Sequence, residues 1–193
     1  KVVFIPDYKV SLAEVLIPAA DVSIQSSTAG FEASGTGNMK FALNGALTVG
    51  TYDGANIEIR EAVGADNFYL FGLREEQIQE MRKNNAYNPR ACYENSEYLR
   101  RILNAVNSNM FCEKDYVLLF KVIYEELLNR DYYFLLADLE AFNKALHDAE
   151  KDYTNPQKWA KKAIINVAKI GYFSSDRAVM EYAKNIWHIK PVD

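Results

Sequence analysis

The segment from Glu32 to Lys40 places an anion-binding loop and a primary amine within nine residues. Gly35 and Gly37 lack a Cβ atom, so they can adopt positive φ and let backbone N–H groups converge on a ligand oxygen. Thr36 adds a hydroxyl donor between them. We therefore expect a phosphate-bearing ligand at this loop, with the amine of Lys40 placed to form a Schiff base with an aldehyde group.

The residues around this segment leave a second interpretation open. Met39 to Leu43 are good helix formers, and the first N–H groups of a helix that follows the loop would favour a phosphate. The segment is neither of the common phosphate motifs. A P-loop has four residues between its glycines and a Ser or Thr after its lysine, and a dinucleotide-binding fingerprint has a third glycine three residues after the second. On local residues alone, such a pattern is more often a plain turn that is followed by a surface lysine.

Strand and helix patterns alternate in the first part of the chain, where eight of the nine glycines lie between Gly30 and Gly72. Short apolar runs predict four strands, at residues 2–5, 22–24, 46–52 and 68–71. Helices are expected at residues 11–17 and 55–62. This alternation predicts an α/β fold with a Rossmann-like parallel sheet, and such sheets bind ligands beyond the carboxyl ends of their strands, where the Glu32–Lys40 segment would lie.

From Arg74 onward the apolar residues recur at helical spacing, so a helix-rich tail is expected to follow the sheet. Asp138 is a candidate N-cap of one of these helices, and Pro156 suits the first turn of another. Residues 83–95 are polar and predict a surface loop. Because the chain has no repeat or obvious linker, we expect residues 1–193 to form one domain.

Composition and charge argue against several classes of function. The 193 residues carry a formal net charge of −4 and no long basic stripe, so neither a nucleic acid nor an anionic membrane is an expected partner. No apolar stretch approaches the length of a membrane span, and the first residues do not form a signal sequence. These features predict a cytoplasmic location.

The cysteines and histidines do not suggest a metal site. Cys92 and Cys112 lack CxxC spacing, and the only imidazoles are those of His147 and His188. We interpret both cysteines as reduced structural residues. The sequence also lacks the Gly-x-Ser-x-Gly elbow of serine hydrolases.

Several segments together resemble the α-glucan phosphorylases, the family of the glycogen, starch and maltodextrin enzymes. The longest match runs from Ser27 to Thr48 and includes the Glu32–Lys40 segment. Other matching segments are distributed along the chain: Tyr8, Val10–Glu14, Ile17–Asp21, Asp53–Asn56, Phe71–Gly72 and Gly171–Arg177. The resemblance implies the C-terminal, Rossmann-like portion of a GT-B glycosyltransferase fold, so the chain is expected to be a fragment of a longer, two-domain enzyme.

The same resemblance implies a retaining phosphorolysis, in which inorganic phosphate cleaves the terminal α-1,4 bond of a glucan and releases glucose 1-phosphate. It implies pyridoxal 5'-phosphate as the cofactor, held as a Schiff base by Lys40, with the cofactor phosphate exchanging a proton with substrate phosphate. Gly35, Thr36 and Gly37 are expected to hold the cofactor phosphate. Tyr8 matches a residue that lies along the pyridoxal ring.

Three residues match positions of the family that hydrogen-bond the glucosyl hydroxyls: Glu32, Ser34 and Gly35. Without the resemblance, simpler roles are open, because Glu32 could be a solvated acid, Ser34 a helix cap and Tyr8 a core aromatic residue. We therefore treat the sugar contacts as implied by the resemblance and not by the local pattern.

The matching segments also contain departures and structural positions. Phe31 stands where a small hydroxylic residue is expected, and Lys9 where arginine is frequent in animal members. Asp53 and Asn56 are expected to close a tight turn and not to touch substrate. The groups that grip substrate phosphate, together with the N-terminal domain, are expected upstream of Lys1, so the chain alone is predicted to be inactive. The resemblance also implies that the full-length enzyme is a homodimer.

Two other classes of function remain compatible with these residues. One is a non-catalytic sugar- or nucleotide-binding half-domain. The other is a nucleotide-sugar glycosyltransferase of GT-B fold, in which a similar loop would bind a diphosphate. Lys40 discriminates among the three, because only the phosphorylase needs an aldehyde-reactive amine at this position.

Overall fold

The computed structural model describes residues 1–111 and 119–190. Within these ranges the strands form one parallel sheet of order β1-β2-β3, made of β1 (Val22–Gln25), β2 (Leu47–Gly50) and β3 (Tyr69–Leu70). Val22 pairs with Leu47, and Val49 pairs with Tyr69, so the carboxyl ends of the strands meet at one edge. The α/β class and the parallel sheet expected from the sequence are confirmed.

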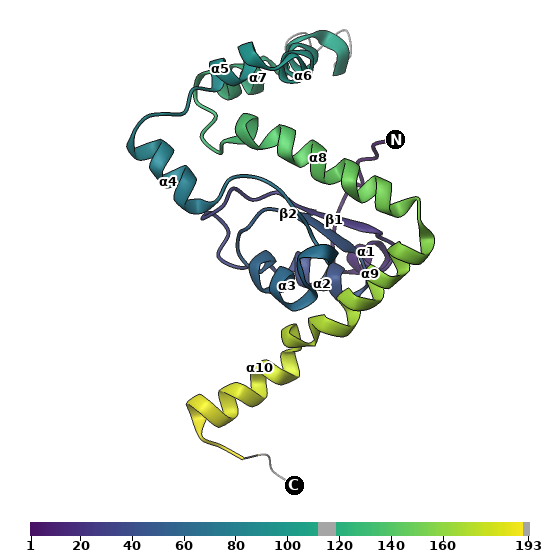
Figure 1. Ribbon diagram of the computed structural model, residues 1–193. Coiled ribbons are helices and arrows are strands. Elements are labelled where there is room, and N and C mark those ends of the chain that lie inside the picture. The colour runs from purple at the N-terminus through teal and green to yellow at the C-terminus, as the bar shows by residue number, and fades with distance from the viewer. Residues whose placement is uncertain (112–118, 191–193) are drawn as a thin grey trace.

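Helices connect the strands and continue beyond them (Figure 1). The α-helices are α1 (Val10–Leu16), α2 (Gly37–Leu43), α3 (Asn56–Val63), α4 (Glu75–Lys83), α5 (Pro89–Asn95), α6 (Glu97–Asn107), α7 (Lys121–Asn129), α8 (Leu135–Tyr153), α9 (Pro156–Lys169) and α10 (Ser175–Tyr182). Shorter 3₁₀ turns lie at Ala65–Asn67, Asn109–Phe111 and Ile170–Phe173, and a π turn at Ala183–Trp187. The helices predicted at 11–17 and 55–62 correspond to α1 and α3.

The sheet is covered on both faces. Helix α2 packs on β1 and β2 from one side, and α8 packs on β2 and β3 from the other (Figure 1). Leu47 and Val49 point to the same face because side chains alternate along a strand, and they join Ala145 and Ala149 of α8 in one apolar core. On the opposite side, Ala42 of α2 packs in a second core with the apolar residues of α3.

A third apolar core holds the helical region together. Leu99 and Leu103 of α6 are four residues apart, so they lie on one face of the helix and pack against Leu128 of α7 and Leu136 of α8. This core is distinct from the two that flank the sheet. Helix α8 therefore joins the sheet to the helical region, as its position between them in Figure 1 shows.

The strand predicted at residues 2–5 does not form. The structure has coil there, and Val2, Val3 and Phe4 are exposed. A strand is stable only when its backbone N–H and C=O groups find partners, and no described residue pairs with this segment. An apolar, β-branched run without a neighbouring strand therefore does not form a strand here.

Two predictions in the helical region are also wrong. Asp138 lies inside α8 and does not cap it; its Oδ1 accepts a hydrogen bond from the N–H of Leu73 at 2.8 Å. The N–H groups of Leu135 and Leu136 instead donate to the carboxylate of Asp131. The loop expected at residues 83–95 contains α5, which is possible because the Asn88 side chain caps it and Pro89 occupies its first position.

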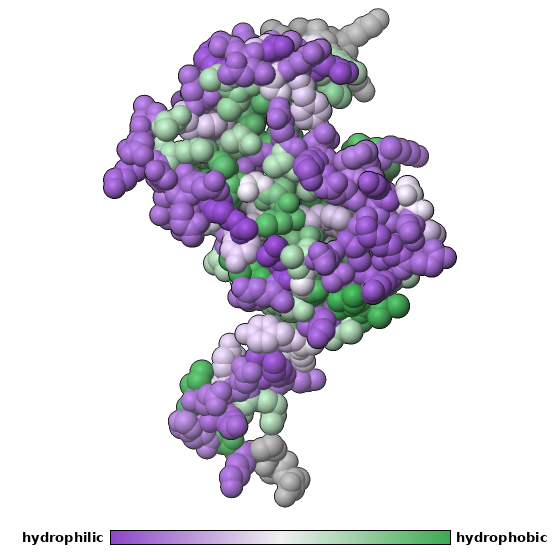
Figure 2. Space-filling model, in the orientation of Figure 1, coloured by the Kyte–Doolittle hydropathy of each residue, from purple (hydrophilic) through white to green (hydrophobic). Residues whose placement is uncertain are grey.

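The end of the described chain projects away from the sheet (Figure 1). Pro156 begins α9 as predicted, with Asn155 as N-cap. Beyond α9, helix α10 and the π turn carry exposed apolar side chains, among them Val179, Met180 and Ile186. Figure 2 shows apolar patches on this projecting part, whereas polar residues cover much of α4 and α8 on the same face of the molecule.

Candidate functional site

The loop that precedes α2 lies beyond the carboxyl ends of β1 and β2, and Asp53 holds it there. The Asp53 carboxylate is buried and accepts one backbone hydrogen bond from Gly30 and another from Glu32, each at 2.9 Å. Thr51 adds a hydrogen bond from its hydroxyl to the carbonyl oxygen of Ser27 at 2.6 Å. The segment after β2 thus fixes the backbone on which Glu32 sits.

A glycine after β2 allows the two segments to approach closely. Gly54 has φ +48°, and a Cβ atom there would lie 2.6 Å from the carbonyl oxygen of Ser34. That same oxygen accepts a hydrogen bond from the N–H of Ala55 at 2.8 Å. Any larger residue at position 54 would push the loop away from β2.

The glycines of the loop play different roles. Gly35 has φ +82°, as expected, and this left-handed turn redirects the chain into α2. Gly37 was also expected to allow a positive φ, but it is the first residue of α2 and its φ is not positive. A Cβ atom at Gly37 would meet nothing within 4 Å, so the space beside it is open.

The start of α2 leaves hydrogen-bond donors available. In the described part of the chain, the N–H groups of Gly37 and Asn38 have no acceptor, as is usual for the first turn of a helix. The side chain of Asn38 is buried; its amide donates to Oδ1 of Asn56 at 2.9 Å, and Asn56 donates to the carbonyl oxygen of Thr51. This amide pair anchors the first turn of the helix to the end of β2.

Lys40 lies one turn into α2 and is exposed. Among residues 1–111 and 119–190 its ammonium group makes neither a hydrogen bond nor an ion pair with another side chain. The side chain of Thr36, the N-cap residue, makes no capping hydrogen bond either. An amine, a hydroxyl and two N–H groups are therefore all open to a ligand, and this donor set suits a phosphate that also carries an aldehyde.

The structure brings together only part of the predicted site. Glu32, Ser34 and Gly35 lie in the loop beside Gly54, and Ser34 is no helix cap, since its hydroxyl donates to the carbonyl oxygen of Gly35 at 3.2 Å. Tyr8 precedes α1, is 63% exposed, and has no described hydrogen bond or aromatic contact with the loop. This exposure excludes the interpretation of Tyr8 as a core residue.

Sequence reasoning missed the supports of the loop. Asp53 and Asn56 close the expected tight turn, since the N–H of Asn56 donates to the carbonyl oxygen of Asp53 at 3.1 Å, but their side chains also hold the loop and the first turn of α2, respectively. Asn38 was not singled out at all. The available signal was the position of Asp53-Gly54-Ala55-Asn56 directly after a strand, where polar side chains of a parallel sheet face ligand loops.

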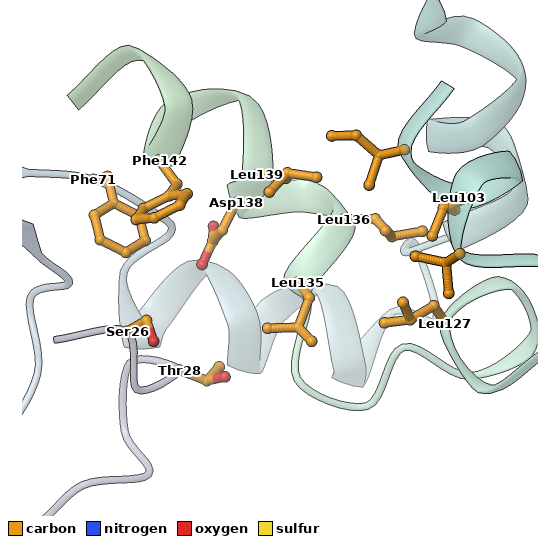
Figure 3. A pocket seen from close by; sticks show the side chains of 12 residues that line it. Ser26, Thr28, Phe71, Leu103, Leu127, Leu135, Leu136, Asp138, Leu139 and Phe142 are labelled. Atoms are coloured by element: carbon orange, nitrogen blue, oxygen red, sulfur yellow. The ribbon is translucent and has the colours of Figure 1, made fainter. Parts of the chain in front are cut away.

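A separate cavity of about 290 Å³ lies between the sheet and the helices α6, α7 and α8 (Figure 3). Its walls are mainly apolar, and Asp138 supplies a carboxylate near Ser26 and Thr28. Burial raises the pKa of Asp138, although the hydrogen bond from the N–H of Leu73 opposes this shift. The residues predicted to bind cofactor or sugar do not line this cavity.

Other features of the described chain add no second candidate site. Within residues 1–111 and 119–190, no helix combines the length and apolar character needed to cross a membrane, and no three His, Cys, Asp or Glu residues are grouped so as to hold a metal ion. Cys92 is a free thiol whose pKa is raised by burial. Cys112 lies outside the described residues.

Comparison with known proteins gives a consistent family. Residues 1–189 match the family described as carbohydrate phosphorylase. The chain is 51% identical over 190 residues to glycogen phosphorylase of Chlamydia trachomatis and 48% identical over 192 residues to that of Synechocystis. It is 47% identical over 193 residues to the brain form of human glycogen phosphorylase.

The matches cover nearly all of this chain but only part of each relative. They span 98% of the chain and 23% of the Chlamydia protein, and 100% of the chain with 22% and 23% of the Synechocystis and human proteins. The chain therefore spans less than a quarter of the length of these relatives. From the extent of the family match and these identities, the chain belongs to the carbohydrate phosphorylase family.

Proposed function

We propose that this chain is the cofactor-binding part of a pyridoxal-phosphate-dependent α-1,4-glucan phosphorylase, which releases glucose 1-phosphate from glycogen, starch or maltodextrin. The observation that carries the proposal is the open amine of Lys40 one turn beyond the free N–H groups of Gly37 and Asn38. Membership of the carbohydrate phosphorylase family supports the same reaction. The relatives named above are glycogen phosphorylases.

The residues of the loop fit the proposed cofactor. Gly37 leaves space for a phosphate, and its N–H group, that of Asn38 and the hydroxyl of Thr36 can donate to phosphate oxygens. Lys40 would hold the aldehyde as a Schiff base. When bound, the cofactor supplies a phosphate whose pKa near neutrality suits proton exchange with substrate phosphate.

The chain's own residues would position the sugar. Asp53 fixes the backbone N–H of Glu32, so the carboxylate of Glu32 starts from a defined place and can accept hydrogen bonds from glucosyl hydroxyls. Ser34 and Gly35, which follow in the same loop, would add a hydroxyl and a backbone group. Tyr8 is exposed, so its ring is open to contact the pyridoxal ring.

Further parts of the proposal concern the whole protein. Its fold would be GT-B, with residues 1–193 inside the C-terminal Rossmann-like half and an N-terminal domain completing the cleft. The glucan and inorganic phosphate would bind between the two halves. A homodimer, a cytoplasmic location and the inactivity of this chain alone remain predictions.

Reductive trapping tests the proposal directly. The purified chain is treated with sodium borohydride with and without added pyridoxal phosphate, and the modified lysine is located by peptide mass mapping. We expect a stoichiometric adduct at Lys40, no adduct in Lys40→Ala, and an unchanged yield in Lys151→Ala, a control at an exposed lysine in the last turn of α8. An adduct spread over many lysines, or equal labelling of Lys40→Ala, would contradict the proposed site and favour a binding module or a nucleotide-sugar transferase.

A further inference from the structure

A cluster of exposed aromatic rings adjoins the loop that carries Glu32. The aromatic cluster consists of Phe31, Tyr132 and Tyr133, whose residues are 42%, 55% and 52% exposed. The centroid of the Phe31 ring lies 5.8 Å from that of Tyr132 and 5.6 Å from that of Tyr133, and the two tyrosine rings are 5.0 Å apart. All three pairs meet edge to face, a favourable arrangement that keeps the rings together while parts of each remain open to solvent.

A cation holds this cluster in place. The guanidinium carbon of Arg82, on α4, lies 4.9 Å from the centroid of Phe31 and 4.6 Å from that of Tyr132. Its Nη2 donates to the carbonyl oxygen of Tyr132 at 2.8 Å. The described part of the chain contains no other hydrogen bond from this group, although a guanidinium has five N–H donors. Arg82 therefore orders the rings and still has donors to offer.

The cluster is built onto the same loop as the proposed sugar contacts. Phe31 lies between Gly30 and Glu32, whose N–H groups both donate to Asp53. The hydroxyl of Thr28 donates to the carbonyl oxygen of Tyr133 at 2.8 Å, which joins the loop to the segment before α8. The rings are thus held at a fixed position next to Glu32.

Aromatic rings that are exposed as a group beside an arginine frequently mark a binding surface. Pyranose rings carry faces of C–H groups that pack on aromatic rings, and hydroxyls that accept from guanidinium and phenol donors. A purely apolar partner would leave the donors of Arg82 and of both phenol groups without acceptors. A carbohydrate can pack on the aromatic rings and also accept hydrogen bonds from these donors.

We propose that Phe31, Tyr132, Tyr133 and Arg82 form a stacking subsite for a glucose unit of the α-glucan, next to the unit that Glu32 contacts. This inference rests on the proposed function for the identity of the sugar. It adds a contact for the glucan chain that does not involve the cofactor. Phe31 is the central residue, because it joins the rings to the loop.

Saturation-transfer difference NMR with maltoheptaose tests the subsite on the chain itself. We expect transfer from the aromatic protons to the sugar, and a dissociation constant raised about three- to tenfold in Phe31→Ala and in Tyr132→Ala. Tyr132→Phe should bind nearly as the unchanged chain does, because it keeps the ring. Tyr172→Ala is the matched control, since Tyr172 is 54% exposed and carries the guanidinium carbon of Arg177 3.9 Å from its ring centroid.

The outcomes separate this subsite from the cofactor site. Lys40→Ala should lose the borohydride adduct but keep binding maltoheptaose, whereas Phe31→Leu should keep the adduct and lose sugar affinity. If Phe31→Leu binds maltoheptaose as the unchanged chain does, the ring only packs the loop and the stacking subsite is wrong. Absence of any saturation transfer at millimolar maltoheptaose would equally overturn it and would indicate that the rings are covered by polypeptide. Circular dichroism of each variant checks that the fold is kept.

Discussion

The two halves of the segment from Gly30 to Lys40 differ in how the rest of the chain contacts them. In the first half, Asp53 accepts from two backbone N–H groups, and Gly54 lies against the carbonyl oxygen of Ser34. In the second half, the N–H group of Gly37 and the amine of Lys40 find no partner among the described residues. The first half is therefore fixed by the framework, whereas the second half is anchored through the buried amide of Asn38 but keeps these two donors open for a ligand.

The largest effect should come from removing the anchor of the first half. Asp53→Ala leaves the N–H groups of Gly30 and Glu32 without their carboxylate, so we expect a loss of about 3 kcal/mol in the free energy of unfolding. Urea unfolding followed by far-UV circular dichroism measures it. Asp66→Ala, at an exposed aspartate, should change stability by less than about 0.5 kcal/mol. An equal loss in the free energy of unfolding in the two variants would show that Asp53 does not hold the first half in place.

A pair of glycine substitutions tests the comparison next. Gly54→Ala forces a Cβ atom to within 2.6 Å of the Ser34 carbonyl oxygen at a φ of +48°, so we expect a loss of about 2 kcal/mol in stability.

The matched variant is Gly37→Ala, whose Cβ atom meets nothing within 4 Å in a helical position. It should hold or raise stability by up to about 1 kcal/mol while weakening the binding of pyridoxal phosphate, because the methyl group enters the open space. Thermal unfolding and the yield of the borohydride adduct report the two effects separately. A Gly37→Ala variant that is destabilised as much as Gly54→Ala would show that the space beside Gly37 is not open.

The sequence predicted the fold class well but not all of its elements. Periodicity and glycine placement located the sheet strands at 22–24, 46–52 and 68–71, because each of these apolar runs has its partners within the chain. The run at 2–5 is also apolar but has no described partner, so local pattern alone could not reveal its coil. The prediction of Asp138 as an N-cap was wrong for a similar reason. Its carboxylate accepts a hydrogen bond from the N–H of Leu73, which is distant in sequence, and local pattern does not reveal such a contact.

The candidate site shows the same limit. The residues Gly35, Thr36, Gly37 and Lys40 are adjacent in sequence, so their spacing and the family resemblance were enough to single them out. Their supports, Asp53 and Asn38, act across the edge of the sheet, and their contacts depend on the register of β1 and β2. Tertiary contacts of this kind cannot be derived from one sequence unless the pairing of the strands is known.

The acid Asp152 gives the stability of the chain a dependence on pH. Asp152 is buried and loses hydration, which by itself raises its pKa, but hydrogen bonds from Lys158, Lys162 and Tyr69 outweigh this and lower it from 3.8 to about 2. Because the folded state has the lower pKa, its contribution to stability is complete above about pH 4 and is lost as the pH falls toward 2. Glu32 is exposed and belongs to the loop.

We therefore expect Asp152→Asn to lose about 1.5 kcal/mol in the free energy of unfolding at pH 7 and to show a flatter decline in stability between pH 4 and pH 2. Glu32→Gln is the control, because it removes one exposed negative charge outside the ion pairs of Asp152. Unfolding in urea at several pH values measures both. A steep acid decline that persists in Asp152→Asn would mean that other carboxylates carry it.

The smallest effect on stability should come from Thr36→Val, and this makes it the sharpest test of the open half. The Thr36 hydroxyl makes no capping hydrogen bond in α2, so its loss should change the free energy of unfolding by less than about 0.5 kcal/mol. If the hydroxyl instead donates to the cofactor phosphate, the same variant should bind pyridoxal phosphate about tenfold more weakly, as judged from the concentration needed to reach half of the maximal borohydride adduct at Lys40. Thr36→Ser keeps the hydroxyl and should restore the affinity. If Thr36→Val binds pyridoxal phosphate with full affinity, the Thr36 hydroxyl does not contact the phosphate, and the N–H groups of Gly37 and Asn38 alone would bind it. If the variant is strongly destabilised, Thr36 has a structural role like that of Asp53.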